Sequence, residues 1–491
     1  MLDLLLYRNN ILELYIPETK DRMNALGQCD CGGACVESIG RKTSKLSAIE
    51  IPKETLGFKS IVLSNNIISI KINNLQFVLF NLYQGTLLIL NNRGYRVLQE
   101  LKQPIKIADF IRGNQSVPRT ILQDFIFTLY IHGILIEEGQ NSQIPQWAYN
   151  SDVLVSWLNL TNQCQLNCNY CYVDRTNEYM DKDTVKQILK SIFEKALSKK
   201  YKRIRLKYAG GESTLVPDIL ISSHLLAKHL AETYKLGLEC TVLTNGIDIP
   251  EHLIDFSVTH KIKWAISLNN LCDHHASSVL FSFNKLQQCG LSPQVTITLT
   301  QENVKEFPKV VKLLLEKKIR FNINFYRQYK KHIGQGSLRP DNLELIRALR
   351  QAYRIIENDL PEYSLLSLLL DRVDLQAPHI YPCVAGYHYM AVNQNGGIVP
   401  CQMLVSQRQF EQPFYNPTVF EKPGYMGKCP WNYYCAGGCP VDAFHAFGHY
   451  DACSPYCQVY RTLAPEVLRL EALRVVKYGQ PVEWDESQLN K

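Results

Sequence analysis

Strand-like runs alternate with helical segments between residues 153 and 327, and this alternation restricts the fold more than any other feature of the chain. The runs are rich in β-branched and aromatic residues and read VLVSWLNL, RIRLKYA, CTVLTN, KWAISLN, QVTITLT and RFNINFY. The segments between them, such as DTVKQILKSIFEKALSK, carry apolar residues at helical spacing. Strand–helix units in series predict a parallel sheet with right-handed crossovers. The predicted fold class is therefore α/β, with a partial (β/α)6 TIM-type barrel over residues 150–345.

The regions on either side of the barrel have different patterns. Three short apolar runs, expected to be strands, lie at 60–66, 67–72 and 77–83. Three helical patterns follow at 91–101, 107–113 and 118–132, and the apolar segment GILIEE (133–138) closes the unit. Strands followed by short helices predict a winged-helix-like α+β domain over residues 56–146. Residues 341–372 carry apolar residues at helical spacing, so we expect a helical bridge over residues 346–380.

Residues 381–460 lack a regular period and are rich in Gly, Pro, Tyr and Cys. Such a segment cannot build a large apolar core, so bound metal is its expected stabiliser. An irregular segment over residues 1–55 and a helix with a tail over residues 461–491 complete the predicted organisation.

Composition places the chain among globular proteins, with 46% hydrophobic and 20% charged residues. No apolar run reaches the roughly 18 residues of a membrane helix. The first residues, MLDLLLYRNN, lack the basic region of a secretory signal. We therefore expect a cytoplasmic protein with no membrane partner. The net charge of +7 is too small to predict nucleic-acid binding.

The chain has 16 cysteines, and in a reducing cytosol such a set predicts metal binding or catalysis rather than disulfides. Most are clustered, and three scattered ones are interpreted as small core residues. The scattered residues are Cys240, Cys272 and Cys289; the clusters are Cys29, Cys31 and Cys35, then Cys164, Cys168 and Cys171, then seven cysteines from Cys383 to Cys457. The role of the first cluster stays open between metal binding, substrate contact and a plain tail.

Cys164, Cys168 and Cys171 directly follow the first barrel strand, in TNQCQLNCNYCYVD. Thiolates on one loop favour a soft metal, either zinc or an iron–sulfur cluster. A structural zinc site normally closes with four ligands, whereas a cubane held by three thiolates keeps one iron open. The loop lies at the carboxyl end of a strand, where barrel enzymes keep their chemistry. A catalytic 4Fe–4S site is therefore favoured over a zinc loop.

This loop resembles that of the radical S-adenosylmethionine (radical SAM) superfamily, whose hallmark is CxxxCxxC with an aromatic residue, here Tyr170, before the last cysteine. Similar segments follow in the family's order at the ends of later strands. They are Gly210-Gly211-Glu212, Thr244-Asn245-Gly246, Ser267-Leu268-Asn269, and Thr298 with Asn303. Where the family often has Ser-Leu-Asp, this chain has Asn269.

The resemblance implies a 4Fe–4S cluster on the three cysteines with S-adenosyl-L-methionine beside it. Glu212 would accept hydrogen bonds from the cofactor's ammonium, and the two glycines would let the backbone approach the cofactor. Electron transfer from the cluster would cleave the sulfonium and give a 5′-deoxyadenosyl radical that takes hydrogen from a substrate. The residues implied in cofactor binding are Tyr170, Gly210, Gly211, Glu212, Ser267, Asn269 and Thr298.

Cations alternate with apolar residues along the second barrel strand. Period two places Arg203, Arg205 and Lys207 on one face. If that face lines the barrel, Lys207 can hold a carboxylate of cofactor or substrate. We expect the Arg203 side chain, and with a weaker preference that of Arg205, to be exposed to solvent at the start of the strand.

The C-terminal cysteines resemble the SPASM extension of radical peptide-modifying enzymes, which carries auxiliary 4Fe–4S clusters. Cys401 follows Gly396 at that extension's spacing, and Met426 stands where the family's CxxCxxxxxCxxxC run has its first cysteine. The resemblance implies two auxiliary clusters, hence three clusters in all. The implied ligand sets are Cys383, Cys401 and Cys439 for one, and Cys429, Cys435 and Cys457 for the other. Either Cys453 fills the position that Met426 leaves, or that cluster keeps an open iron; a zinc ribbon is the alternative.

The N-terminal domain resembles the peptide-recognition element of ribosomal natural-product maturases, a PqqD-like fold. In that family a leader peptide adds a strand to the sheet edge. The alternative is a winged-helix DNA binder, which needs a basic recognition helix. The candidate helix, PRTILQDFIFTLYIHG, has one Arg and no Lys, which argues against nucleic acid as a partner.

Together these resemblances imply a SPASM-class maturase of a ribosomally made precursor peptide, whose leader binds residues 56–146. Flavodoxin or ferredoxin would donate the electron. The implied reactions are crosslinking through thioether or carbon–carbon bonds, epimerisation, or splicease-type backbone excision, on precursors of the nif11 or proteusin type. The alternatives are a maturase of a whole protein, such as a sulfatase, and a zinc-stabilised DNA-binding regulator.

Overall fold

The central feature is a mostly parallel eight-stranded sheet, seen in a computed structural model. The structure describes the backbone of Leu14–Tyr15 and residues 59–140, 152–269, 271, 275–329, 337–411 and 429–479. The sheet has the strand order β13-β12-β11-β10-β9-β8-β14-β15. Its parallel strands in chain order are β8 (Val153–Thr161), β9 (Arg203–Gly210), β10 (Gly237–Thr244), β11 (Lys263–Ser267), β12 (Gln294–Leu299) and β13 (Phe321–Phe325). The predicted α/β class and its six consecutive parallel strands are confirmed, and the sheet stays open because its two ends do not pair with each other.

Two further strands come from the cysteine-rich segment, in which no strand was predicted. β14 (Tyr389–Val392) pairs in parallel with β8, and β15 (Ile398–Val399) pairs antiparallel with β14. All four residues of β14 are buried, and Gly396, with φ of +83°, lies in the turn between these strands. A strand of four residues is too short to show a period, which is why the pattern missed it.

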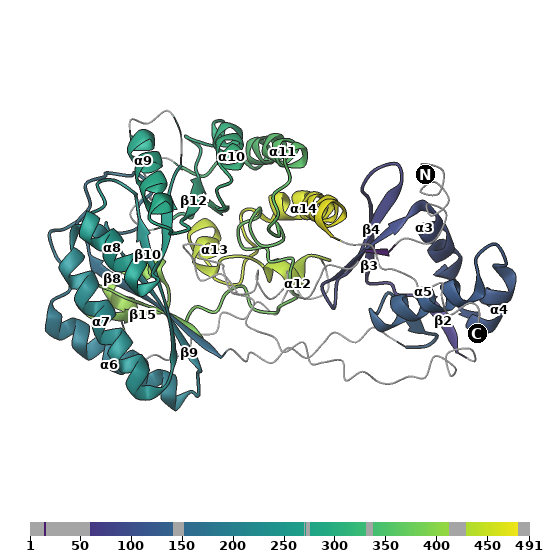
Figure 1. The fold of residues 1–491 in the computed structure, drawn as a ribbon, viewed down its shortest axis with the longest axis horizontal. Coiled ribbons are helices and arrows are strands. Elements are labelled where there is room, and N and C mark those ends of the chain that lie inside the picture. Colours follow the sequence, from purple (N-terminus) through teal and green to yellow (C-terminus); the bar gives the residue numbers. More distant parts are fainter. Residues whose placement is uncertain are drawn as a thin grey trace.

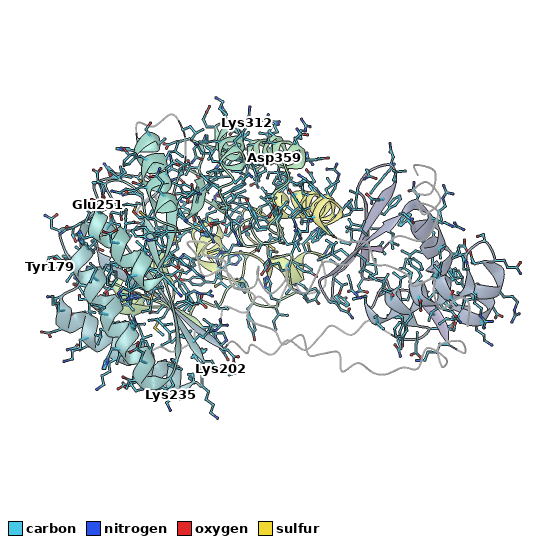
Figure 2. All side chains as sticks on the ribbon, in the orientation of Figure 1. Tyr179, Lys202, Lys235, Glu251, Lys312 and Asp359 are labelled. Atoms are coloured by element: carbon cyan, nitrogen blue, oxygen red, sulfur yellow. The ribbon has the colours of Figure 1, made fainter. Side chains whose placement is uncertain are left out.

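Helices cover the outer face of the sheet (Figure 1). They are α6 (Lys182–Ser198), α7 (Pro217–Tyr234), α8 (Glu251–His260), α9 (His275–Gln288) and α10 (Phe307–Glu316). Asp181 caps α6 by accepting hydrogen bonds from the backbone N–H groups of Asp183 and Thr184. Labelled side chains on this layer, such as Glu251 and Lys312, point away from the sheet (Figure 2).

The helix expected over residues 341–372 is shorter than predicted. α11 (Asn342–Asn358) is capped by Asp341 and ends three residues before Pro361. The backbone from residue 359 to residue 388 has turns and bends but no helix, so the predicted helical bridge over residues 346–380 is helical only in its first part. Proline disfavours helical geometry in the residue before it, and this explains the early end.

The C-terminal segment lies between the barrel and the N-terminal domain (Figure 1). Its helices are η6 (Gln402–Leu404), η7 (Arg408–Phe410), α12 (Asn432–Cys435), α13 (Pro440–Phe447) and α14 (Cys457–Tyr478). α14 packs beside α11, where Arg469 Nη1 donates to Glu357 Oε2 at 2.7 Å. Residues 480–491 of the expected tail lie outside the described residues.

The described residues of the N-terminal domain form two small antiparallel sheets, three α-helices and one short 3-10 helix. Its elements are β2 (Ser60–Leu63), β3 (Ile67–Lys71), β4 (Gln76–Asn81), β5 (Thr86–Asn91), α3 (Asn92–Gln99), η3 (Glu100–Lys102), β6 (Ile105–Lys106), α4 (Ile107–Gly113), α5 (Arg119–Ile131) and β7 (Leu135–Glu137). β5 was not predicted, because its continuous apolar run TLLILN has no alternation. The larger sheet has the order β1-β5-β4-β3, in which β1 (Leu14–Tyr15) pairs antiparallel with β5.

The N-terminal domain shares a hydrophobic core with the C-terminal segment. Phe80 and Leu82 belong to the same buried cluster as Tyr434, and the Phe80 and Tyr434 ring centroids are 5.2 Å apart. The Tyr434 hydroxyl donates to the carbonyl oxygen of Leu82 at 2.8 Å. Arg469 Nε donates to the Ile72 carbonyl at 3.1 Å. These contacts hold the domain against residues that neighbour the C-terminal cysteines.

Among the described helices, none is long and apolar enough to cross a membrane. Cys29, Cys31, Cys35 and Cys272 lie outside the described residues.

Candidate active site

A closed loop carries Cys164, Cys168 and Cys171 above the carboxyl end of β8. Its base is fixed because the returning chain pairs with the end of the strand. Met180 N–H donates to the Leu160 carbonyl at 2.7 Å, and Asn162 N–H donates to the Glu178 carbonyl at 2.9 Å. The cysteines therefore lie on a loop whose two ends are bonded together.

Within the loop, short-range hydrogen bonds orient the thiols. Cys171 N–H donates to the Cys168 carbonyl at 3.2 Å, and Leu166 N–H donates to Cys164 Sγ at 3.4 Å. Asn245, at the end of β10, donates to Cys164 Sγ at 3.8 Å. Burial raises the pKa of Cys164, as do the nearby charges of Glu212, Cys168 and Cys171. The three cysteines thus lie near one another on the loop, partly buried and not joined by a disulfide.

Gly210 and Gly211 are needed for contact between the end of β9 and the start of the cysteine loop. A Cβ on Gly210 would lie 2.2 Å from the Thr161 carbonyl oxygen, and a Cβ on Gly211 would lie 2.3 Å from that of Gln163. Gly211 N–H donates to the Thr161 carbonyl at 2.7 Å. From the sequence, both glycines were expected to leave room for the cofactor only. The structure shows that the backbone of the cysteine loop already leaves no room for a side chain at either position.

Glu212 is buried and ties two strand ends together. One carboxylate oxygen accepts from Thr214 N–H at 3.0 Å and from Thr214 Oγ1 at 2.8 Å, and the other accepts from Asn245 N–H at 2.7 Å. Burial raises the pKa of Glu212 despite these donors. Asn245 therefore bonds both to Glu212 and to Cys164. The sequence singled out the Thr244-Asn245-Gly246 segment, but it gave Asn245 no role.

Tyr170 and Asn269 connect the cysteine loop to β12. The Asn269 side-chain amide donates to the Tyr170 hydroxyl, and its oxygen accepts from Thr298 N–H at 2.8 Å. Asn303 donates to the Thr298 carbonyl at 2.8 Å. Ser267 is exposed at the end of β11. Burial raises the pKa of Tyr170 well above its usual range, so the phenol is a neutral hydrogen-bond partner.

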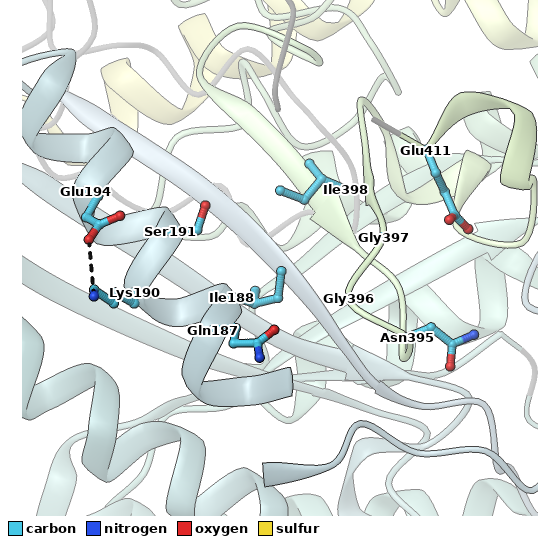
Figure 3. Close-up of a pocket in the computed structure, with 10 residues that line it drawn as sticks. All are labelled: Gln187, Ile188, Lys190, Ser191, Glu194, Asn395, Gly396, Gly397, Ile398 and Glu411. Carbon is cyan, nitrogen blue, oxygen red and sulfur yellow. Dashed lines mark ion pairs between the residues drawn. The ribbon is translucent and has the colours of Figure 1, made fainter. Parts of the chain in front are cut away.

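These side chains line a single cavity of 520 Å³ at the carboxyl ends of the strands. The structure brings all the predicted catalytic and cofactor-contacting residues into its wall, namely Cys164, Cys168, Cys171, Tyr170, Gly210, Gly211, Glu212, Ser267, Asn269 and Thr298. A second, larger cavity of 710 Å³ lies between α6 and the turn at Asn395–Gly397 (Figure 3). It contains the Lys190–Glu194 ion pair at 3.8 Å and no cysteine, so cavity size alone does not identify the site.

The cations of β9 differ in their surroundings. Arg203 is half exposed, as expected, but the Arg205 side chain is only 5% exposed and its Nη2 lies 3.0 Å from Glu239 Oε2. The expectation that Arg205 is solvated is therefore wrong, because Glu239 on the adjacent strand neutralises it within the sheet. Lys207 is 1% exposed and shares a strand face with Ala209, which lines the cavity.

The C-terminal cysteines divide into two groups. In the first, Cys383, Cys401 and Cys439 share an apolar cluster with Cys171 and Tyr172 of the cysteine loop. Burial raises the pKa of Cys401 to about 12, and the nearby charges of Cys439 and Cys383 contribute to this shift.

A hydrogen bond links the two regions directly, since Asp174 N–H donates to Ser406 Oγ at 3.0 Å. The first group therefore lies next to the cysteine loop.

The second group lies on the side of the N-terminal domain. Cys429 and Cys435 pack on the core that also contains Phe80 and Leu82. Burial raises the pKa of Cys435 to about 12, with further increases from the charges of Cys429, Cys457 and Cys453. The two sets of cysteines that the sequence pattern implied thus lie in different surroundings, and Cys453 is near Cys435 as well.

Sulfur donors of this kind fit iron–sulfur clusters or zinc. Among the described residues, no three His, Cys, Asp or Glu side chains converge as ligands of a single metal ion. A cubane does not need that convergence, because each of its thiolates binds a different iron. The three-cysteine loop beside a cavity fits a cluster with one free iron.

Comparison with known proteins defines the class of the central domain. Residues 158–314 match the family model of the radical SAM superfamily. The chain therefore contains a radical SAM domain, as the CxxxCxxC loop implied.

Individual relatives are distant. The radical SAM cyclopropyl synthase TigE of Paramaledivibacter caminithermalis is 19% identical over 239 residues, which cover 44% of this chain and 50% of TigE. The Fe-coproporphyrin III synthase of Methanosarcina barkeri is 23% identical over 230 residues, covering 44% and 53% of the two chains. The chain thus spans about half the length of these curated relatives.

Among solved structures, anSMEcpe with bound AdoMet and the Cp18Cys peptide is 17% identical, with a TM-score of 0.54. The similarity covers 66% of this chain and 99% of that one. At this identity the likeness shows a shared fold.

Proposed function

We propose that the protein is a radical SAM enzyme that modifies a ribosomally synthesised precursor peptide. The observation that carries the proposal is the cavity at the carboxyl ends of the strands, whose wall contains the three cysteines and the seven residues implied in cofactor binding, but not Lys207. Barrel enzymes act at this face. The volume of 520 Å³ is in the range of cofactor and ligand pockets.

Cys164, Cys168 and Cys171 would hold the 4Fe–4S cluster, and the cavity wall would hold S-adenosylmethionine. When bound, the cluster and cofactor supply one-electron chemistry that generates a radical able to take hydrogen from a peptide. Asn245 donates to Cys164 and to the Glu212 carboxylate, so it sets the position of both. Asn269 fixes the Tyr170 ring against β12.

A peptide substrate is supported by the N-terminal domain and by the relatives. A structure of similar fold contains a bound peptide. An extended leader peptide can add a strand to an exposed sheet edge. Within the larger N-terminal sheet, the outer strands are β1 and β3, so a leader would pair with β3 or take the position of β1 beside β5.

The domain also lacks the features of a DNA reader. α5, the candidate recognition helix, contains Arg119 and no lysine, and most of its length is apolar. This favours the peptide-recognition proposal over the regulator alternative.

The proposal includes two auxiliary clusters and a one-electron donor such as flavodoxin or ferredoxin. Three cubanes correspond to roughly 12 irons per chain. The bond that is made or broken in the peptide stays open between crosslinking, epimerisation and excision.

Co-expression tests the proposal. The regions beside the gene would be searched for a short open reading frame, the protein would be expressed together with it, and the peptide would be analysed by mass spectrometry. We expect a mass change in the core region that needs the leader and disappears with the Cys164/Cys168/Cys171→Ala variant. An unchanged peptide together with S-adenosylmethionine cleavage would reject the peptide substrate while leaving the radical chemistry intact.

A further inference from the structure

The second group of C-terminal cysteines has a gap in its sequence pattern. Met426 stands where the pattern has a thiolate, and a thioether is a poor ligand for iron. Met426 itself lies outside the described residues. The question is whether another side chain supplies the missing ligand.

The turn before α14 brings Cys453 to the other three cysteines. Ser454 N–H donates to the Gly437 carbonyl at 2.8 Å, which ties this turn to the loop between Cys435 and Cys439. Cys457 N–H donates to the Ser454 carbonyl at 2.9 Å. The two segments are therefore bonded backbone to backbone beside the thiols.

Gly438 permits this close approach. Its φ is +77°, and a Cβ at this position would lie 2.5 Å from the Ser454 Cβ. Ala436 and Gly437 before it also have positive φ values, of 42° and 82°. A run of left-handed residues is costly unless the surrounding structure requires it, and here it lets the chain after Cys435 lie against the turn that contains Ser454.

Cys453 lies four positions before Cys457, in the turn that leads into α14 (Cys457–Tyr478). The contact of this turn with the 435–439 loop therefore brings Cys453 and Cys457 together to the segment that carries Cys435. Cysteine thiolates are the usual ligands of a 4Fe–4S cluster. Cys453 and Cys457 are both free thiols.

We propose that Cys453 is the fourth ligand of the second auxiliary cluster, together with Cys429, Cys435 and Cys457. This inference rests on the proposed function, because it assumes that the group binds a cluster. It makes the two auxiliary sites unequal: the second has four thiolates, whereas the described residues of the first provide Cys383, Cys401 and Cys439.

The test measures iron in the full chain on the Cys164/Cys168/Cys171→Ala background, so that only auxiliary iron is counted. After anaerobic reconstitution we expect roughly 8 irons per chain. Adding Cys453→Ala should lower this to roughly 4, or keep the iron but alter the Mössbauer signal of one site. Cys457→Ala should give the same loss, and Cys289→Ala, at a cysteine outside both groups, should give none.

A second measurement avoids any folding defect of the variants. In the reconstituted wild-type protein, iodoacetamide followed by mass spectrometry should leave Cys453 unmodified until the clusters are removed with a chelator. Cys289 is partly buried and lies outside both groups. Its extent of modification should therefore be the same before and after the clusters are removed.

The failures are distinguishable. Full iron and an unchanged spectrum in Cys453→Ala, with loss in Cys457→Ala, would overturn the assignment of Cys453 alone. Equal labelling of Cys453 before and after cluster removal would also overturn the assignment of Cys453 as a ligand. A background protein without iron, or with zinc in the second group, would overturn the auxiliary clusters of the proposed function instead.

Discussion

Gly210 and Gly211 set how closely the cysteine loop lies on β9. The sequence identified them correctly as positions without room for a side chain, but it named the cofactor as the reason. The structure shows that the carbonyl oxygens of Thr161 and Gln163 already occupy the space. Packing between segments far apart in sequence cannot be read from a local motif.

Gly211→Ala should destabilise the protein even without cofactor. The added Cβ would lie 2.3 Å from a backbone oxygen, and overpacking of this kind costs about 1–3 kcal/mol. Thermal unfolding of the cluster-free protein should show a lowered midpoint. Gly113→Ala is the size-matched control for added volume, because no atom lies within 4 Å of its added Cβ and its backbone is outside the left-handed region. An unchanged midpoint in Gly211→Ala would show that the loop moves away freely.

Arg205 shows the limit of reasoning from alternation. The alternation of side chains along β9 correctly predicted that Arg205 shares a face with Lys207. The residue that neutralises Arg205, however, is Glu239 on another strand. Glu239 also lies 3.5 Å from Lys263 and 3.3 Å from the exposed Arg203. Cross-strand charge pairing depends on the register of β9 and β10, which the sequence did not specify.

Glu239→Gln should leave Arg205 buried without its charge partner, at a cost of about 3 kcal/mol. Burial opposes ionisation of Glu239, but Arg205 and Lys263 outweigh it and hold its pKa below the usual 4.5. The stabilisation is therefore present above pH 4.5 and is lost as the pH falls through the lower, folded-state pKa. Chemical denaturation should give a lower free energy of unfolding for the variant than for wild type at pH 7, and this difference should disappear in acid.

Arg203→Gln, at the exposed partner, should cost less than about 1 kcal/mol. If the difference in free energy of unfolding between wild type and Glu239→Gln did not change with pH, the electrostatic explanation would be contradicted.

At the level of elements, strands and helices with a strong period were predicted and short or uniformly apolar ones were not. The strands of the radical SAM domain match their predicted runs. β1, β5, β6, β14 and β15 were missed because they lack alternation or length, and α11 ends early because of Pro361. The predicted cavity residues were all brought together, since the carboxyl ends of neighbouring parallel strands meet at one edge.

Tyr434 connects two elements that no local pattern relates. Its ring packs on Phe80 and its hydroxyl donates to the Leu82 carbonyl, which holds the N-terminal domain beside Cys435. Such a docking contact becomes visible only in three dimensions.

Tyr434→Phe should weaken this attachment. The buried Leu82 carbonyl would lose its donor, at a cost of about 1–3 kcal/mol. Hydrogen exchange should become faster at the β4–β5 turn while the barrel strands keep their protection. Tyr179→Phe, on the outer surface of the barrel (Figure 2), is the matched control and should change neither. Unchanged exchange in Tyr434→Phe would mean that the apolar core alone fixes the domain.

Across the whole molecule, the cysteine groups follow one another from the barrel to the N-terminal domain. The cysteine loop shares an apolar cluster with Cys383, Cys401 and Cys439. Cys429 and Cys435 pack on the main hydrophobic core of the barrel, which also contains Phe80 and Leu82 of the N-terminal domain. Under the proposed function, a peptide held by the N-terminal domain would be attached through the segment that carries the C-terminal cysteines.

The central claim is that Cys164, Cys168 and Cys171 hold the cluster that cleaves S-adenosylmethionine. The most direct measurement is 5′-deoxyadenosine formation by anaerobically reconstituted protein with a chemical reductant, in wild type and in the Cys164/Cys168/Cys171→Ala variant. We expect the variant to form none, while it keeps roughly 8 of roughly 12 irons on its auxiliary cysteines. Wild-type amounts of 5′-deoxyadenosine from the variant would contradict the account.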